Sequence, residues 1–287
     1  MSYFKAAAWL KEQLEAKAVK AGQFVVVDTR YVLSDSEAGE KAYAESHIPG
    51  AYYLSLSEHL SSPKHIEGIG GRHPLPAPTD FAAIVQRVGI ANNMTVVAYD
   101  DQGGAMSSRL RWLLQWLGHD GEVYILEGGF KGWVEAGYEV TSEVPELVQG
   151  VQFDVKMRSE MLVSQQYVHS KLGASGTVII DSREGARYRG EVEPIDRAAG
   201  HVPGAINRFW AEGQRSDGTW KTPEEQAERF AGLNKDDEII VYCGSGVTAT
   251  PNVFALNDAG FRNVKLYAGS WSDWSANPDN PVATGEE

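Results

Sequence analysis

The two halves of the chain repeat four sequence blocks in the same order. "FVVVDTR" and "TVIIDSR" are β-branched runs that end in Asp, a small hydroxyl residue and Arg, and each is followed by a His-x-Pro-Gly-Ala block. "TVVAYD" and "EIIVYC" form the third pair, and "YILEGGFKGW" and "VKLYAGSWSDW" form the fourth. Ordered recurrence of four blocks at similar spacing indicates a duplicated domain.

Helix-like segments such as "PTDFAAIVQRVG" and "TPNVFALNDAG" lie between these apolar blocks. Short strands that alternate with helices are typical of α/β domains with largely parallel sheets. We therefore predict tandem domains over residues 1–143 and 159–287, each a mainly parallel five-stranded sheet flanked by helices. The turn-prone segment 144–158 is the predicted linker, and residues 1–22 are expected to form an amphipathic helix rather than a targeting segment.

Cys243 is the only cysteine in 287 residues, and it directly follows the apolar run "EIIVY". In open α/β sheets, ligands bind at the carboxyl ends of the strands, which is a poor place for a packing cysteine. Gly244 and Gly246 allow close backbone approach, Ser245 and Thr248 can donate hydrogen bonds, and the following helix adds the positive end of its dipole. These features stabilise negative charge on sulfur and predict a nucleophilic Cys243.

Alignment of the two halves places Asp100 opposite Cys243. We therefore expect a catalytic C-terminal domain and a non-catalytic N-terminal domain. A single cysteine rules out an internal disulfide, a thiolate metal cluster and a Cys-x-x-Cys exchange enzyme. A reactive thiol survives best in a reducing compartment, which predicts a cytoplasmic protein.

The formal net charge of −13 argues against nucleic-acid or anionic-membrane partners, because both need clustered Lys and Arg. No window reaches the roughly 20 apolar residues of a membrane span. A small anionic substrate remains compatible with the sequence, since arginines gather in "SREGARYRGEVEPIDR". A monomer is expected.

The motifs "CGSGVTA", the two His-x-Pro-Gly-Ala blocks, "GSWSDW" and the tandem arrangement resemble the two-domain rhodanese-like sulfurtransferases, over essentially the whole chain. The neutral loop is similar to that of the 3-mercaptopyruvate branch, whereas thiosulfate-preferring members typically carry basic residues in it. The resemblance implies that Cys243 takes a sulfur atom from the donor as a persulfide. It then passes the sulfur to cyanide, a thiol or a protein acceptor such as a thioredoxin-like protein. No cofactor is expected and no metal ligands are assigned.

The resemblance also assigns the other site residues. Backbone groups of the loop, including Gly244, Gly246, Val247 and Thr248, would hold the donor and the anionic persulfide. Because mercaptopyruvate carries a carboxylate and a ketone, it needs a bidentate cation, and the family's substrate-binding arginines fall on two residues. These are Arg187 in "GARYRG" and, with a one-residue shift, Arg197 in "EPIDR".

In the N-terminal half, His73 in "GRHPLP" matches the family histidine that faces the active cysteine across the domain interface. The resemblance makes it our candidate to polarise or protonate the departing enolate. A relay through Ser245 would complete the catalytic set. The acidic residue that partners this histidine in some mercaptopyruvate enzymes aligns with Ser57, beside Glu58, so the carboxylate is missing there.

Features that recur in both halves are expected to be structural, since only one half has the nucleophile. His47 and His201 should fix the loop before each Pro-Gly turn, and Asp28 and Asp181 have the same interpretation. The pair Trp271 and Trp274 is expected to pack the core of the C-terminal domain.

Three other functions were weighed. A thiosulfate sulfurtransferase uses the same chemistry, but a dianion favours a cation in the loop. A cysteine phosphatase needs an arginine where Ala249 stands, which argues against it. A non-catalytic binding module would have a thiol of ordinary reactivity.

Overall fold

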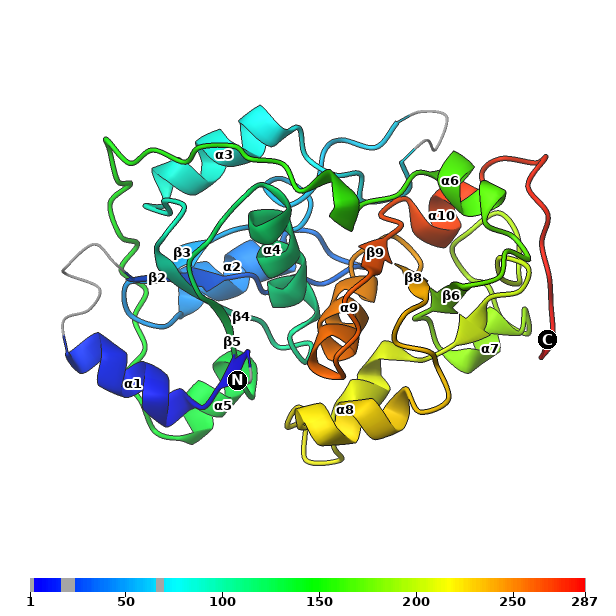
Figure 1. Cartoon of the computed structure of the whole chain (residues 1–287). Coiled ribbons are helices and arrows are strands. Elements are labelled where there is room, and N and C mark those ends of the chain that lie inside the picture. Colours follow the sequence, from blue (N-terminus) through cyan, green and yellow to red (C-terminus); the bar gives the residue numbers. More distant parts are fainter. Residues whose placement is uncertain (1–2, 17–23, 66–69, 287) are drawn as a thin grey trace. The chain divides into compact units, whose positions relative to one another are not determined.

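The structure, a computed structural model, describes residues 3–16, 24–65 and 70–286 and divides into two compact units (Figure 1). Unit 1 consists of Met1–Ser62, Pro76–Arg158 and Ser216–Trp220, and unit 2 consists of Pro63–Leu75, Ser159–Arg215 and Lys221–Glu287. Two short segments therefore belong to the unit formed mainly by the other half of the chain. The continuous domains 1–143 and 159–287, with the linker 144–158, remain a proposal.

Unit 1 contains a five-stranded parallel sheet in the order β1-β5-β4-β2-β3. Its strands are β1 (Phe4–Lys5), β2 (Phe24–Asp28), β3 (Tyr52–Tyr53), β4 (Thr95–Tyr99) and β5 (Val123–Leu126). Its helices are α1 (Ala7–Glu15), α2 (Ala38–Glu45), α3 (Pro78–Arg87), α4 (Ala105–Trp116) and α5 (Gly129–Glu135). Every residue of β2 is buried, as the continuous apolar run predicts for a central parallel strand.

The predicted helix over residues 1–22 is shorter in the structure. Residues 4 and 5 form the edge strand β1, which pairs with β5, and the helix α1 begins only at Ala7. Phe4 pairs with Ile125 in the sheet, because the backbone N–H and C=O groups of an edge strand find hydrogen-bond partners on the neighbouring strand. Residues 1–2 and 17–22 of the predicted helix lie outside the described residues.

Unit 2 contains a parallel sheet in the order β7-β6-β8-β9. Its strands are β6 (Thr177–Asp181), β7 (Ile206–Asn207), β8 (Glu238–Tyr242) and β9 (Val264–Leu266). Its helices are α6 (Gln165–Ser170), α7 (Gly185–Tyr188), α8 (Pro223–Arg229), α9 (Ala249–Asp258) and α10 (Ser270–Trp274), with 3₁₀ turns η1 (Ser159–Met161) and η2 (Trp210–Gly213). The predicted five strands are corrected to four for this domain. A single parallel bridge between Leu162 and Leu266 takes the place that β1 has beside β5 in unit 1.

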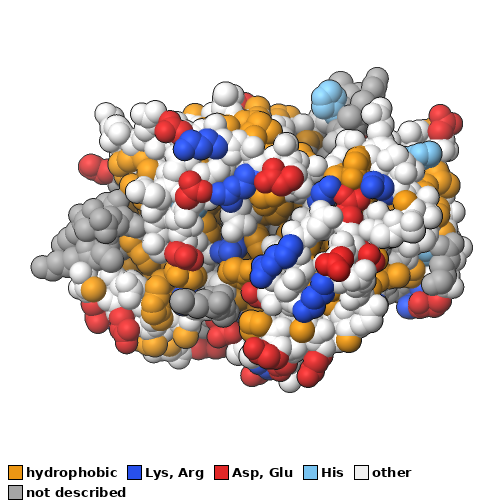
Figure 2. Space-filling model, viewed as in Figure 1, with side chains coloured by type: hydrophobic (Ala, Val, Ile, Leu, Met, Phe, Trp, Pro, Cys, Tyr) orange, Lys and Arg blue, Asp and Glu red, His pale blue; other side chains and the backbone are white. Residues whose placement is uncertain are grey.

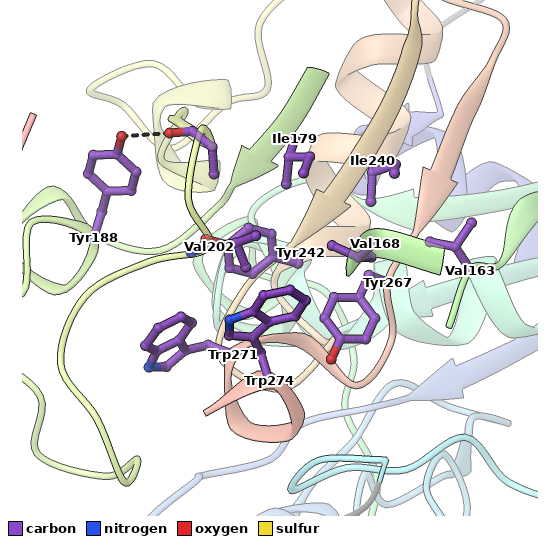
Figure 3. Packing of buried hydrophobic residues seen from close by; sticks show 11 residues of the cluster. Val163, Val168, Ile179, Tyr188, Val202, Ile240, Tyr242, Tyr267, Trp271 and Trp274 are labelled. Carbon is purple, nitrogen blue, oxygen red and sulfur yellow. Dashed lines mark hydrogen bonds between the residues drawn. The ribbon is translucent and has the colours of Figure 1, made fainter. Parts of the chain in front are cut away.

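The core of unit 2 gathers aromatic side chains beneath the end of β8 (Figure 3). Trp271 and Trp274 are fully buried there together with Tyr242 and Tyr267. The indole N–H of Trp271 donates to the carbonyl of Ala198 at 2.9 Å, so its polar atom is satisfied inside the core. The packing role predicted for both tryptophans is confirmed.

The same buried ion pair lies at the end of one strand in each unit, β2 in unit 1 and β6 in unit 2. Arg30 donates through Nε to Asp28 at 2.9 Å, and Arg183 donates through Nε to Asp181 at 3.0 Å. Nη2 of each guanidinium donates to the carbonyl of the residue directly before the repeated histidine. These carbonyls belong to Ser46, at 2.7 Å, and Gly200, at 2.6 Å. Each pair therefore joins a strand end to a distant loop.

The repeated histidines are structural as well. The ring of His47 stacks on Tyr43 and the ring of His201 on Tyr188, each with 3.9 Å between ring centroids. Nδ1 of each histidine lies within 2.8 Å of the carbonyl oxygen of the tyrosine on which it stacks. Both rings are fully buried, which agrees with a role in holding the loop.

On the face shown in Figure 2, acidic and basic side chains lie interspersed over the surface. This mixture accompanies the overall excess of acidic residues, whose formal net charge is −13. Within the described ranges, none of the helices is long and apolar enough to cross a membrane.

We predict that Asp181→Ala lowers the free energy of unfolding by about 3–5 kcal/mol, because it leaves the buried guanidinium of Arg183 without its principal partner. Urea denaturation followed by tryptophan fluorescence measures this change. The control is Glu191→Ala, which breaks an exposed pair with Arg189 and should leave the free energy of unfolding close to the native value. Equal losses for the two variants would contradict the role given to the buried pair.

Candidate active site

Cys243 lies directly after β8, at the carboxyl edge of the unit 2 sheet, and its side chain is buried. The backbone N–H of Cys243 donates to Oγ of Ser270 at 3.1 Å, and its carbonyl accepts from the N–H of Trp271 at 2.9 Å. Ser270 is the one described non-glycine residue with a positive φ, 57°. A strained residue of this kind is held in place by its surroundings, and here it fixes the backbone of Cys243.

The loop after Cys243 turns back so that the N–H of Gly246 donates to Sγ at 3.2 Å. Gly246 has φ of 75°, and a Cβ at this position would collide with the carbonyl oxygen of Ala268. Glycine is therefore required by both backbone conformation and space. The hydrogen bond stabilises a thiolate or a persulfide more than it stabilises a neutral thiol.

The equivalent loop of unit 1 holds a carboxylate. Asp100 accepts from the backbone N–H groups of Gln102 at 2.8 Å, Gly104 at 2.9 Å and Ser107 at 2.9 Å. The same strand–loop–helix arrangement therefore surrounds an anionic side chain with backbone donors in one unit and a sulfur atom in the other. This internal comparison supports the charge-stabilising role predicted for the loop after Cys243.

His73 and Ser245 lie together in unit 2, because the segment Pro63–Leu75 belongs to that unit. Nδ1 of His73 is 2.8 Å from Oγ of Ser245, and both side chains are buried. The segment is anchored by the N–H of Arg72, which donates to Oγ of Ser272 at 3.1 Å. The structure thus brings the two predicted partners of Cys243 into contact.

Two guanidinium groups lie over Gly244, the residue after the nucleophile. The position of a Cβ on Gly244 would be 2.9 Å from Nη2 of Arg72 and 3.4 Å from Nη1 of Arg187. A Cβ here would push the end of Arg72 aside and touch Arg187 at an ordinary contact distance, so glycine leaves room for Arg72 beside the loop. Arg187 is therefore placed where a donor carboxylate would need it.

Both arginines are paired with buried carboxylates. Nη2 of Arg187 lies 2.7 Å from Glu193 and 3.1 Å from Asp196, and Arg72 also binds Asp196. Burial favours the neutral form of Glu193. Hydrogen bonds from Arg187 and from the backbone N–H of Asp196 outweigh this and hold the pKa of Glu193 below its usual value. Glu193 is ionised at neutral pH.

The remaining predicted residues have less direct positions. Arg197 is exposed and donates to the carbonyl of Ala276 at 3.2 Å. Val247 is buried, and Thr248 immediately precedes helix α9. Their backbone groups form the far end of the loop.

Sequence reasoning missed Arg72, Asp196 and Ser270. Arg72 directly precedes His73 in "GRHPLP", and Asp196 directly precedes Arg197, so both were adjacent to residues that were singled out. Ser270 stands in "GSW", and its counterpart in the "GGF" of the first half is Gly129, which also has a positive φ, 60°. The glycine at the repeated position was the signal that could have marked Ser270.

We predict that Gly246→Ala displaces the loop, slows alkylation of Cys243 by iodoacetamide and lowers stability by about 1–3 kcal/mol. The added methyl group meets the Ala268 carbonyl. Gly204→Ala is the matched control, because Gly204 also has φ of 75° but open space around its Cβ position. If both variants behave alike, the conformation of Gly246 matters but its contact with residue 268 does not.

Comparison with known proteins agrees with this geometry. The sequence profile of the rhodanese-like domain matches residues 6–136 and 164–277. The chain is 42% identical over 278 residues to a protein of Pseudomonas aeruginosa named "Probable 3-mercaptopyruvate sulfurtransferase", covering 96% of this chain and 97% of that protein. It is 34% identical over 242 residues to a thiosulfate sulfurtransferase of the same organism, covering 84% and 86% of the two chains.

Among solved structures, the crystal structure of SseA from Escherichia coli, described as a 3-mercaptopyruvate sulfotransferase, superposes with a TM-score of 0.78 at 31% identity. The superposition covers 94% of this chain and 99% of that one. Sequence and fold thus agree along nearly the full length of both chains.

Proposed function

This chain belongs to the rhodanese-like family as a sulfurtransferase, and we propose that it takes its sulfur from 3-mercaptopyruvate through a persulfide on Cys243. The observation that carries the proposal is the N–H of Gly246 directed at Sγ of Cys243, 3.2 Å away. A persulfide anion needs such a donor beside the cysteine. The paired arginines over Gly244 support a donor that carries a carboxylate.

In the first step, the thiolate of Cys243 attacks the mercapto sulfur of the donor. A sulfur–sulfur bond forms, the carbon–sulfur bond breaks, and its electron pair remains on the three-carbon fragment as the pyruvate enolate. The proton of the donor thiol ends on the methyl carbon of pyruvate, so the products are pyruvate and the Cys243 persulfide anion. The contact between His73 and Ser245 at 2.8 Å supports a proton relay for this transfer.

In the second step, an acceptor attacks the outer sulfur of the persulfide and releases the Cys243 thiolate. We propose that cyanide, a small thiol or a thioredoxin-like protein serves as the acceptor, with a monomer as the working form. The single reactive cysteine supports a cytoplasmic location.

A second candidate function is thiosulfate sulfurtransferase activity, favoured by two arginines beside the loop and by the 34% identical relative with that name. Cys243 would attack the sulfane sulfur, the sulfur–sulfur bond of thiosulfate would break, and sulfite would leave with the electron pair. Since no carbanion forms, this reaction does not need the proton relay through Ser245.

We expect native protein to transfer sulfur to cyanide from mercaptopyruvate faster than from thiosulfate, and Cys243→Ser to abolish both reactions. Thiocyanate formation measures turnover, and mass spectrometry of the donor-treated protein should show one added sulfur atom on the peptide that contains Cys243. Faster turnover with thiosulfate would contradict the proposal that mercaptopyruvate is the donor and would favour thiosulfate instead. No Cys243-dependent turnover with either donor would favour a non-catalytic binding module.

We predict that Ser245→Ala lowers kcat for mercaptopyruvate by about 10²-fold or more and changes kcat for thiosulfate only a few-fold, because only the first reaction creates a carbanion. His73→Gln should have the same donor-selective effect. The control is Ser170→Ala, which removes a hydroxyl group that bonds the carbonyl of Tyr167. Equal losses with both donors would show that Ser245 supports the loop instead of moving a proton.

A further inference from the structure

The carboxylate of Asp196 lies between the two arginines that stand over Gly244. Its Oδ1 binds Arg72, and its Oδ2 is 3.1 Å from Nη2 of Arg187. Only 4% of the Asp196 side chain is exposed. One buried carboxylate therefore holds together an arginine of the Pro63–Leu75 segment and an arginine of helix α7.

The loop that carries Asp196 is fixed by Glu193. Oε1 of Glu193 accepts from the N–H of Ile195 at 3.1 Å and from the N–H of Asp196 at 3.0 Å. Oε2 of Glu193 also lies 3.2 Å from Nη1 of Arg183. These hydrogen bonds fix the backbone that carries the Asp196 carboxylate.

The charged side chains of this network cancel. Three arginines and three carboxylates take part: Arg72, Arg183, Arg187, Asp181, Glu193 and Asp196. An incoming donor therefore meets, beside the Cys243 thiolate, directed N–H groups of a network with zero formal charge. Arginine keeps several donors free when one side of its guanidinium is paired, so binding of a single carboxylate remains favourable.

We propose that Asp196 determines donor specificity by disfavouring dianions relative to monoanions, an inference that rests on the sulfurtransferase function proposed above. Its negative charge is close to the place where the donor anion must bind, beside Arg72 and Arg187. Coulomb repulsion is proportional to the charge of the ligand, so thiosulfate, a dianion, is repelled about twice as strongly as the monocarboxylate of mercaptopyruvate.

The test compares kcat/KM for thiosulfate with kcat/KM for mercaptopyruvate in Asp196→Asn and in native protein, at low salt. We expect the thiosulfate-to-mercaptopyruvate ratio to rise by about tenfold, mainly through a lower KM for thiosulfate. The rise should shrink at high ionic strength, which a merely structural role would not produce. Asp196→Glu keeps the charge and should keep the native ratio.

Glu191→Gln is the matched control, because it removes one negative charge from the same loop at an exposed residue paired with Arg189. It should change the ratio less than about twofold. Asp196→Ser removes the same charge with a smaller side chain and replaces Asp196→Asn if that variant does not fold. A ratio that stays within twofold of native in the folded neutral variant overturns the inference.

A binding measurement separates this inference from the proposed function. In the Cys243→Ser background, calorimetric titration with sulfite and with pyruvate at mildly alkaline pH compares a dianion with a monocarboxylate without turnover. Asp196→Asn should strengthen sulfite binding about tenfold more than pyruvate binding. If native protein has no sulfurtransferase activity but this difference is found, the proposed function fails and the charge selection stands; equal strengthening of both ligands overturns the charge selection.

Discussion

The hydrogen bond from the N–H of Gly246 to Sγ of Cys243 depends on a short stretch of backbone with almost no freedom. Gly246 adopts a positive φ and lies against the carbonyl of Ala268, where any side chain would collide. Ser270, two residues after Ala268, also has a positive φ, and its Oγ accepts from the N–H of Cys243. The aromatic core of unit 2 holds both segments, since Tyr242 and Trp271 flank them and are fully buried. Packing thus fixes the site before any ligand binds.

Comparison of the two duplicated units separates the features that both share from those found beside Cys243 alone. Each unit has a buried Asp–Arg pair at a strand end and a histidine stacked on a tyrosine, so these features belong to the scaffold that both units share. The loops differ in what they enclose: three backbone donors surround the carboxylate of Asp100, and a backbone donor meets the sulfur of Cys243. The carboxylate of Asp100 is held by the backbone donors of its own loop, which supports the proposal that only unit 2 carries a nucleophile.

The sequence predicted the features of the site that depend on residues close together in the chain. The cysteine loop follows from a motif whose residues are close in the chain and fixed to a strand end. The expectations for Arg187 and His73 came from the family resemblance, because His73 is 172 residues from its contact partner Ser245. Arg72 and Asp196 are 124 residues apart, and their contact exists because the Pro63–Leu75 segment belongs to unit 2. No periodicity or spacing encodes that placement. The number of strands in the second sheet could not be predicted from the sequence either, since the single bridged pair of Leu162 and Leu266 differs from a short strand only in its hydrogen bonds.

The neutrality of the cysteine loop and the neutrality of the arginine network bear on the same choice of donor. A loop without cations leaves anion binding to Arg72 and Arg187, and both are already paired with Asp196. Attraction for a second negative charge is therefore weak, while the hydrogen-bond geometry for one carboxylate is intact. A donor with one negative charge and a breakable carbon–sulfur bond agrees with this site, and the relay proposed for His73 and Ser245 would carry a proton to the carbanion that such a donor releases. Charge balance and proton relay consequently favour the same substrate class for independent physical reasons.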